Sequence, residues 1–144
     1  MKKFAVVAAM ATAFLGSTAY AAELEVTHWW TSAGEAAAIA EFAKVFEEET
    51  GNTWVDSALA GSGTGANPVI ISRIIGGNPM GATQMNTGRD AEELIQAGLM
   101  RDLTDVVADL DIDSFYVDQD LLEPCRYEGG LYCLPVNIHS WDWL

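Results

Sequence analysis

The sequence predicts an α/β fold in which a mostly parallel sheet is flanked by helices. Segments with the two-residue periodicity of strands alternate along the chain with segments of helical spacing. Gly, Asn and Pro residues separate these segments, as expected for turns. Hydrophobic residues make up 50% of the 144 residues, which excludes a disordered acidic chain. Because strand–helix–strand order requires crossover connections, we expect the strands to be parallel.

The first 21 residues are predicted to be a signal peptide. Lys2 and Lys3 precede an apolar run over residues 4–15, and Ala19-Tyr20-Ala21 places small residues where signal peptidase requires them. An uncleaved membrane anchor is the alternative, but the run is too short to cross roughly 30 Å of hydrocarbon. We therefore expect residues 22–144 to form an exported domain.

The first predicted unit is a strand over Leu24–Trp30 followed by a helix over Glu35–Glu49. Ser32 is the expected N-cap, and Glu35 lies at the position of its capping-box partner. Gly51 is expected to end the helix in the left-handed conformation. Helical spacing puts a set of apolar side chains on one face, namely Ile39, Phe42, Ala43 and Phe46.

The second unit is a strand over Thr53–Leu59, a Gly-rich loop over Ala60–Ala66 and a helix over Asn67–Ile75. Gly76-Gly77-Asn78-Pro79 ends this helix. The Gly-rich loop fits an anion cradle or a flexible connector. It lacks the Gly-Lys-Ser/Thr of a phosphate loop, which favours the connector.

The third unit is a short strand over Ala82–Asn86 and a helix over Arg89–Ala97, closed by Gly98. A turn and a short helix are expected over Arg101–Val106. An acidic, amphipathic stretch follows over Asp111–Leu122. The apolar side chains expected to be buried in this stretch are Ile112, Phe115, Tyr116 and Leu122.

Two cysteines flank a predicted hairpin. A three-residue loop of Glu128, Gly129 and Gly130 would place Cys125 opposite Cys133. An oxidising compartment would join them in a disulfide. Free thiols and a metal pair are the alternatives, but seven intervening residues do not match the usual zinc spacing.

Composition and motifs exclude several function classes. The net charge of −14 argues against nucleic-acid binding, because few cations are available to neutralise phosphates. His28 and His139 lack an accompanying zinc motif, and the aspartates of residues 102–113 lack the central Gly and terminal Glu of a calcium loop. The chain has no Gly-x-Ser-x-Gly elbow and no clear His-based triad. We therefore expect no metal, no cofactor and no catalysis.

The carboxyl ends of the predicted strands are the expected ligand site, as in other open parallel sheets. Aromatic, amide, carboxylate and imidazole groups are predicted to meet there. Ring faces stack on the CH-rich faces of sugars, and amides and carboxylates satisfy sugar hydroxyls. The candidate substrate-binding residues are Trp29, Trp30, Glu35, Gln84, Asn86 and His139.

Structural roles are open alternatives for these residues. Side chains alternate along a strand, so Trp29 and Trp30 point to opposite faces, and at least one is expected in the core. Glu35 fits a helix cap as well as a ligand-binding role.

Five segments carry a resemblance to a known family. They are Glu25–Trp30 with Glu35, Arg73–Pro79, Gln84–Asn86, Gly98–Thr104 and Tyr127–His139. In this order and behind a signal peptide, they resemble extracellular solute-binding proteins of the ABC-transporter sugar-binding type, in particular the glucose/mannose-type periplasmic binding proteins.

The resemblance implies a monomeric two-lobed protein that captures a small-molecule sugar, a glucose- or mannose-like monosaccharide. The protein would deliver this sugar to the membrane permease subunits of an ABC importer. Residues 22–144 would form part of the N-terminal lobe, and the apolar end at Ser140–Leu144 suggests a fragment of a longer protein. The alternative is a secreted carbohydrate-active enzyme of the glycoside hydrolase type. That enzyme needs two carboxylates roughly 5–9.5 Å apart, and Glu35 has no evident partner.

Overall fold

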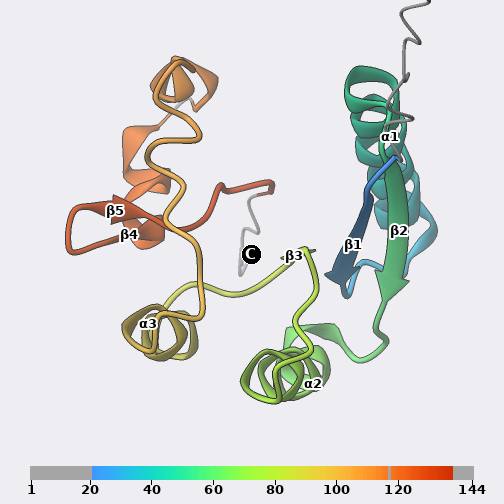
Figure 1. The fold of residues 1–144 in the computed structure, drawn as a ribbon, viewed down its shortest axis with the longest axis horizontal. Helices are drawn as coiled ribbons and strands as arrows, with labels where there is room; N and C mark the ends of the chain where they lie inside the picture. The colour runs from blue at the N-terminus through green and yellow to red at the C-terminus, as the bar shows by residue number, and fades with distance from the viewer. Residues whose placement is uncertain (1–20, 117, 138–144) are drawn as a thin grey trace, which may run out of the picture.

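A three-stranded parallel sheet organises the first half of the chain in this computed structural model, which describes residues 21–116 and 118–137 (Figure 1). Strands β1 (Glu23–His28), β2 (Thr53–Ala58) and β3 (Ala82–Thr83) are arranged in the order β2-β1-β3. The central strand β1 is parallel to both neighbours. The predicted parallel sheet is therefore confirmed. The predicted signal peptide, apart from Ala21, and the candidate residue His139 lie outside the described residues.

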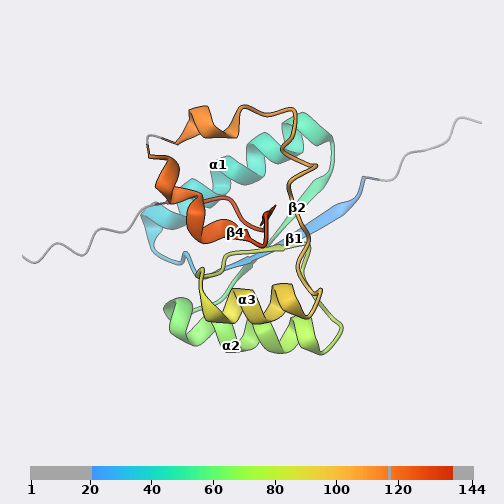
Figure 2. The same cartoon turned by 90° about the vertical axis from the view of Figure 1, so that its left-hand side faces the viewer.

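Helices cover both faces of this sheet. Helix α1 (Ala33–Thr50) packs on one face, where the rings of Phe46 and Trp54 meet edge to face with centroids 5.9 Å apart. Helix α2 (Ser62–Ile75) packs on the other face, and α3 (Arg89–Gln96) lies beside α2 (Figures 1 and 2). The order of strands and helices agrees with the sequence prediction, although β1 ends at His28 and β3 is only two residues long.

Both predicted caps of α1 are present. The Glu35 amide donates to Ser32 Oγ over 3.5 Å, and the Ser32 amide donates to Glu35 Oε2 over 3.1 Å. At the other end, Gly51 has φ of 68°, and its amide donates to the Glu47 carbonyl. The predicted buried face is only partly covered, because Phe42 remains 45% exposed.

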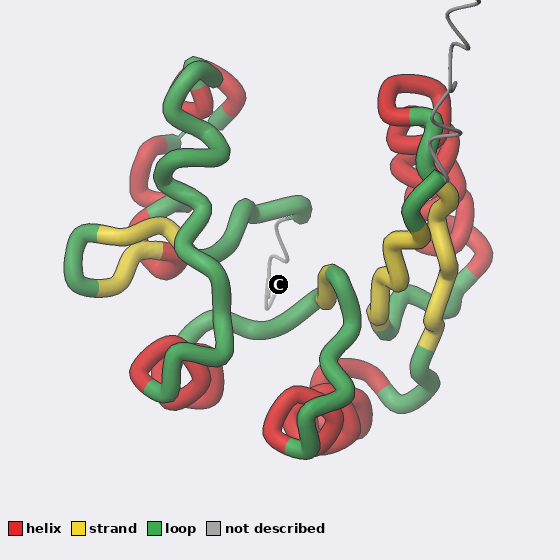
Figure 3. Tube along the Cα trace, viewed as in Figure 1, coloured by secondary structure: helices red, strands yellow, loops and turns green. Residues whose placement is uncertain are grey.

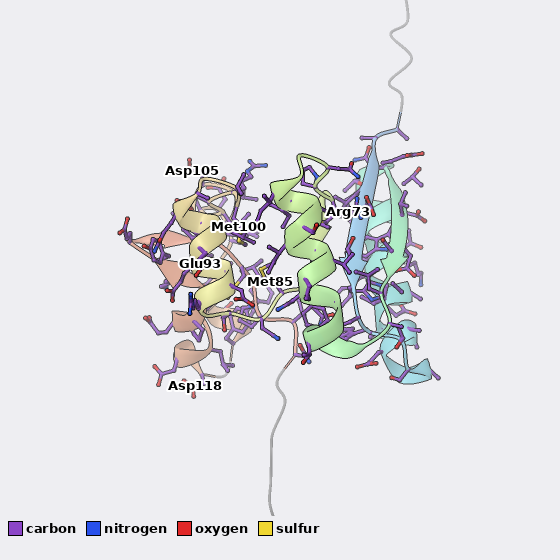
Figure 4. The ribbon with its side chains drawn as sticks, turned by 90° about the horizontal axis from the view of Figure 1, so that it is seen from below. Arg73, Met85, Glu93, Met100, Asp105 and Asp118 are labelled. Atoms are coloured by element: carbon purple, nitrogen blue, oxygen red, sulfur yellow. A yellow bond between two sulfur atoms is a disulfide. The ribbon has the colours of Figure 1, made fainter. Side chains whose placement is uncertain are left out.

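The main hydrophobic core lies between α2, α3 and the sheet. Its buried members are Ala66, Ile70, Ile74, Met80 and Leu94. Met85 and Met100 pack against this cluster, and Figure 4 shows both side chains between α2 and α3. Removing a large aliphatic side chain such as Ile70 from water stabilises the fold by roughly 2–3 kcal/mol.

An ion pair joins the central strand to α2. The Arg73 guanidinium donates through Nη1 to Glu25 Oε1 over 2.6 Å and through Nη2 to Glu25 Oε2 over 2.8 Å. Its Nε also donates to the Asn78 carbonyl, so one side chain links β1, α2 and the segment that leads into β3 (Figure 4). This bidentate hydrogen bonding lowers the pKa of Glu25 to about 2.

The predicted Gly-rich loop is wrong, because most of it belongs to helix α2. The helix begins at Ser62, with Gly61 as the N-cap at φ of 108°. Glycine is a poor helix former by propensity alone. Tertiary packing reverses that preference at Gly63, where a side chain would collide with Asn86 and Trp29.

The second half of the described chain contains turns over Arg101–Val106, where a turn and a short helix were predicted (Figure 3). Three 3-10 helices follow: η1 (Ile112–Phe115), η2 (Gln119–Leu121) and η3 (Glu123–Cys125). Because η1 and η2 are separate turns, one helical spacing does not apply across the predicted stretch Asp111–Leu122.

The burial predicted for this stretch is correct at Leu122, holds only in part at Ile112 and Tyr116, and is wrong at Phe115. Leu122 belongs to a second buried cluster with Val107, Cys125 and Leu131, and Ile112 and Tyr116 pack against it. Phe115, which was expected to be buried, is 75% exposed. It is the last residue of η1, where the helical spacing assumed in the prediction ends.

The hairpin is tighter than predicted. Strands β4 (Arg126–Tyr127) and β5 (Gly130–Leu131) pair through a two-residue turn of Glu128 and Gly129, with φ values of 47° and 89°. Positive φ at both turn positions is what a type I′ turn requires. Gly130 is in the strand because Leu131 is held from outside the hairpin: its amide donates to Thr104 Oγ1 over 3.1 Å.

The predicted disulfide between Cys125 and Cys133 is present, with Cα atoms 5.0 Å apart. The predicted register of the hairpin was wrong, but the pairing of the cysteines was correct. The bridge closes the end of the hairpin and joins the second buried cluster, in which Cys125 is 4% exposed. None of the helices in the described residues is long and apolar enough to cross a membrane.

Removal of the disulfide should destabilise the fold. A ring of this size corresponds to at most about 2.6 kcal/mol of loop entropy. We expect the double variant Cys125→Ser/Cys133→Ser to unfold at lower urea concentration. Mass spectrometry of the wild-type peptide pair should show a mass two hydrogens below that of the dithiol. Quantitative thiol labelling without reductant would contradict the assignment.

The Glu25–Arg73 pair should make stability depend on acid. The folded-state pKa of Glu25, about 2, is below the ordinary value of 4.5. The pair therefore stabilises the fold above pH 4.5, and this contribution is lost as the pH falls from 4.5 toward 2. We expect Glu25→Gln to be less stable than wild type at pH 7 and to lose less stability over that acid range.

The matched control for this variant is Glu93→Gln. Glu93 forms an ion pair with Arg89 within α3, but the two side chains are 62% and 88% exposed. An exposed pair of this kind contributes little. Urea unfolding at several pH values measures both variants, and equal behaviour of Glu25→Gln and Glu93→Gln would contradict the structural role of the Glu25–Arg73 pair.

Candidate functional site

The carboxyl ends of the three strands gather several polar and aromatic side chains. Trp29 and Trp30 follow directly after β1, and Gln84 and Asn86 follow β3. The amino-terminal end of α2 follows β2 after a short connection. Because the strands are parallel, all of these segments emerge at the same edge of the sheet.

Gln84 is hydrogen-bonded directly to another candidate residue, Trp29. Its backbone amide donates to the Thr27 carbonyl over 2.8 Å, which continues the pairing of β3 with β1. Its side-chain Oε1 accepts a hydrogen bond from the Trp29 amide over 3.1 Å. Gln84 therefore holds the backbone at the point where β1 ends.

Trp29 and Asn86 meet above the first turn of α2. A Cβ atom at Gly63 would lie 2.8 Å from Asn86 Nδ2 and 3.3 Å from Cζ2 of the Trp29 ring. The Trp29 ring is partly buried against the main hydrophobic core. The indole ring and the Asn86 amide therefore both border the first turn of α2.

Trp30 follows Trp29 in the chain, so its side chain is expected on the opposite face of the sheet. It is only 7% exposed. Its backbone amide donates to His28 Nδ1 over 3.2 Å. His28 in turn hydrogen-bonds Asp56 Oδ1 through Nε2 over 2.5 Å. The expectation that one of the two tryptophans is buried in the core agrees with this arrangement, and Trp29 is the more exposed ring.

Glu35 lies in the first turn of α1 and forms the capping box with Ser32, which was the structural alternative to a ligand-binding role. Its Oε2 accepts hydrogen bonds from the amide and the hydroxyl of Ser32, over 3.1 and 2.7 Å. The structure thus brings Trp29, Gln84 and Asn86 together and places Glu35 in the capping box. His139 lies outside the described residues.

An open hollow adjoins Asn86 at the start of α2. It is lined by Gly63, Thr64, Asn67, Pro68, Ile71, Asn86 and Asp90. A second, smaller cavity lies between α3 and the hairpin, and Asn86 lines both. Sequence reasoning did not single out Asn67 or Asp90, because Asn67 was placed at the start of one predicted helix and Asp90 within the next. The packing of α2 against the segment after β3 brings the two residues to the same hollow, and no local pattern indicates it.

The chemistry of this edge suits a neutral, hydroxyl-rich ligand. Asn and Gln side chains both donate and accept hydrogen bonds, as hydroxyl groups do. A rigid indole face offers apolar contact area beside them. Among the described residues, no group of three or more His, Cys, Asp or Glu side chains is placed to hold a metal ion.

Comparison with known proteins extends this description. No protein-family model matches the chain. A "Probable sugar-binding periplasmic protein" of Rhizobium meliloti is 37% identical over 147 residues, which cover 100% of this chain and 35% of the relative. An "Uncharacterized ABC transporter extracellular-binding protein" of Pyrococcus horikoshii is 28% identical over 119 residues, which cover 81% of this chain and 26% of the relative.

A solved structure shares the fold. CpMnBP1 with mannotriose bound superposes with a TM-score of 0.61 at 23% identity, over 79% of this chain and 28% of that chain. The parallel sheet with helices on both faces and this likeness define the class, the α/β fold of the periplasmic binding proteins.

The sequence relatives are named for sugar binding. The chain is similar along its whole length to two proteins named "Probable sugar-binding periplasmic protein", from Rhizobium meliloti and Mesorhizobium japonicum, which confirms the resemblance found in the sequence. It spans between 26% and 35% of the length of the curated relatives that it matches.

Gly63 should be sensitive to a single methyl group. In Gly63→Ala, the new Cβ would displace the Asn86 amide, which is the end of a movable side chain, and press on the Trp29 ring. We expect a change in Trp fluorescence and near-UV circular dichroism with little loss of thermal stability. Alanine also favours the helix by up to about 1 kcal/mol over glycine.

Gly65→Ala is the matched control. Gly65 lies in the same helix, and a Cβ there would meet only the Ala60 carbonyl at an ordinary 3.7 Å. This variant should keep the wild-type spectra. Identical spectra for Gly63→Ala and wild type would contradict the contact between Gly63, Trp29 and Asn86.

Proposed function

We propose that this chain supplies part of the sugar site of a periplasmic binding protein that serves an ABC importer. The observation that supports this proposal most strongly is the junction of Trp29, Gln84 and Asn86 at the carboxyl edge of the sheet. The names of the sequence relatives point to the same activity, and one of them is named as part of an ABC transporter.

The proposed ligand is a glucose- or mannose-like sugar. The similar solved structure, CpMnBP1, was determined with mannotriose and also with mannobiose bound. We therefore propose a mannose-type unit against Trp29, either as a monosaccharide or as one end of a short oligosaccharide. Trp30, Glu35 and His139 remain proposed site residues, and the site would deliver its sugar to permease subunits in the membrane.

We propose a binding role without catalysis, with the protein acting as a monomer in the periplasm. The relatives are named as binding proteins. A glycoside hydrolase would instead need a second carboxylate opposite Glu35, whose Oε2 is already engaged by Ser32. A reducing-sugar release assay distinguishes the two functions: no release is expected from mannobiose that the protein binds.

Truncation of the exposed tryptophan should weaken sugar binding. In the protein expressed from its complete gene, we expect Trp29→Ala to bind mannobiose about thirtyfold more weakly, equivalent to about 2 kcal/mol, because an aromatic anchor is lost. Isothermal titration calorimetry measures the affinity. Unchanged affinity for every mannose-type and glucose-type sugar tested would contradict the site.

Trp30→Ala provides the comparison. Its ring is buried, so truncation is expected to lower the free energy of unfolding by roughly 3 kcal/mol or more. Thermal melting of the ligand-free variants separates the two effects. If both variants lose stability and neither loses sugar affinity, the two tryptophans are only structural.

A further inference from the structure

His28 lies at the end of β1, directly before the two tryptophans. Its side chain is 3% exposed, and both ring nitrogens have hydrogen-bond partners from different parts of the chain. Its carbonyl also accepts the Leu59 amide over 2.7 Å, so the backbone is held as firmly as the ring.

The partners of the ring determine where its proton lies. The Trp30 amide can only donate, so Nδ1, 3.2 Å away, must be the unprotonated acceptor. The remaining nitrogen, Nε2, then carries the proton and donates it to Asp56 Oδ1. The geometry therefore requires the neutral Nε2–H tautomer.

Protonation would disrupt one side of this arrangement. An imidazolium ring is a donor at both nitrogens, so Nδ1–H would face the donor amide of Trp30. The bond to Asp56 would be retained as an ion pair. The Trp30 amide, which is buried, would lose its acceptor, and the backbone that carries both tryptophans would have to move.

Few other charges act on this ring among the described residues. From β2, Asp56 faces it, and β3 offers only Ala82 and Thr83. On the opposite face of the sheet, Arg73 of α2 is paired with Glu25. In α1, Glu47 accepts the Trp54 amide, and Glu35 accepts from Ser32. Asp56 is thus the charged group in direct contact with the imidazole.

We propose that His28 is a positioning residue for the sugar site, which holds Trp30 through Nδ1 only while the ring is neutral. The inference rests on the proposed function, because Trp30 is one of the proposed sugar-binding residues. Loss of the acceptor at Nδ1 is therefore expected to weaken sugar binding.

The first measurement is independent of sugar. Long-range ¹H–¹⁵N correlation spectra of the protein expressed from its complete gene report which imidazole nitrogen carries a proton. The signal that is absent in His28→Gln belongs to His28. At pH 8 we expect protonated Nε2 and bare Nδ1. Slow exchange of the Trp30 amide in wild type, lost in His28→Leu, supports the bond, and a proton on Nδ1 at pH 8 overturns it.

The second measurement is mannobiose affinity by calorimetry at pH 8. Gln at position 28 can still accept from Trp30 and donate to Asp56, so His28→Gln should bind within about threefold of wild type. His28→Leu, which cannot accept the Trp30 amide, should bind about tenfold more weakly.

A control variant separates the two partners of the ring. Asp56→Asn retains an oxygen that accepts from Nε2–H, so it should keep both the pH 8 affinity and the Nδ1 contact. His28→Gln that binds at least about tenfold more weakly than wild type would overturn the proposal, even if His28→Leu fails to fold. Absence of sugar binding by wild type at pH 8 would instead refute the proposed function, and the imidazole spectra and Trp30 exchange would still decide the role of His28.

Discussion

The position of β1 between two parallel strands is the constraint on which the rest of the structure depends. A central strand has hydrogen-bonded neighbours on both edges and helices on both faces, so its polar side chains must find partners within the fold. Glu25 is held by Arg73 on the side of α2, and His28 is held by Asp56. The same strand delivers Trp29 and Trp30 to the edge at which the other strands also end.

That constraint explains why the position of the candidate site was easier to predict from the sequence than its contacts were. The alternation of strands and helices, the capping box of Ser32 and Glu35, and the end of α1 at Gly51 all rest on local patterns, and the structure agrees with them. The expectation that a ligand binds at the carboxyl edge of the sheet follows from that order alone. The side-chain bond from Gln84 to Trp29 joins residues that are 55 positions apart, and no local pattern indicates it.

The errors of the sequence prediction share a physical cause, which is that long-range contacts override local preference. Glycine at position 63 reads as a loop signal, yet its missing side chain allows α2 to approach Trp29 and Asn86. Gly130 was expected in a turn, but the contact of Leu131 with Thr104 draws it into β5. Phe115 was expected to be buried because one helical period was extended over two separate 3-10 turns.

The central claim is that the carboxyl edge of this sheet binds a mannose-type sugar against Trp29, with Trp30 behind it. Its most direct test is an NMR titration of mannobiose into the ¹⁵N-tryptophan-labelled protein, followed through the indole signals. The account predicts that the signals of Trp29 and Trp30 shift and saturate together, whereas Trp54, which packs against α1, stays unchanged. Saturable binding that leaves both Trp29 and Trp30 unshifted would contradict it.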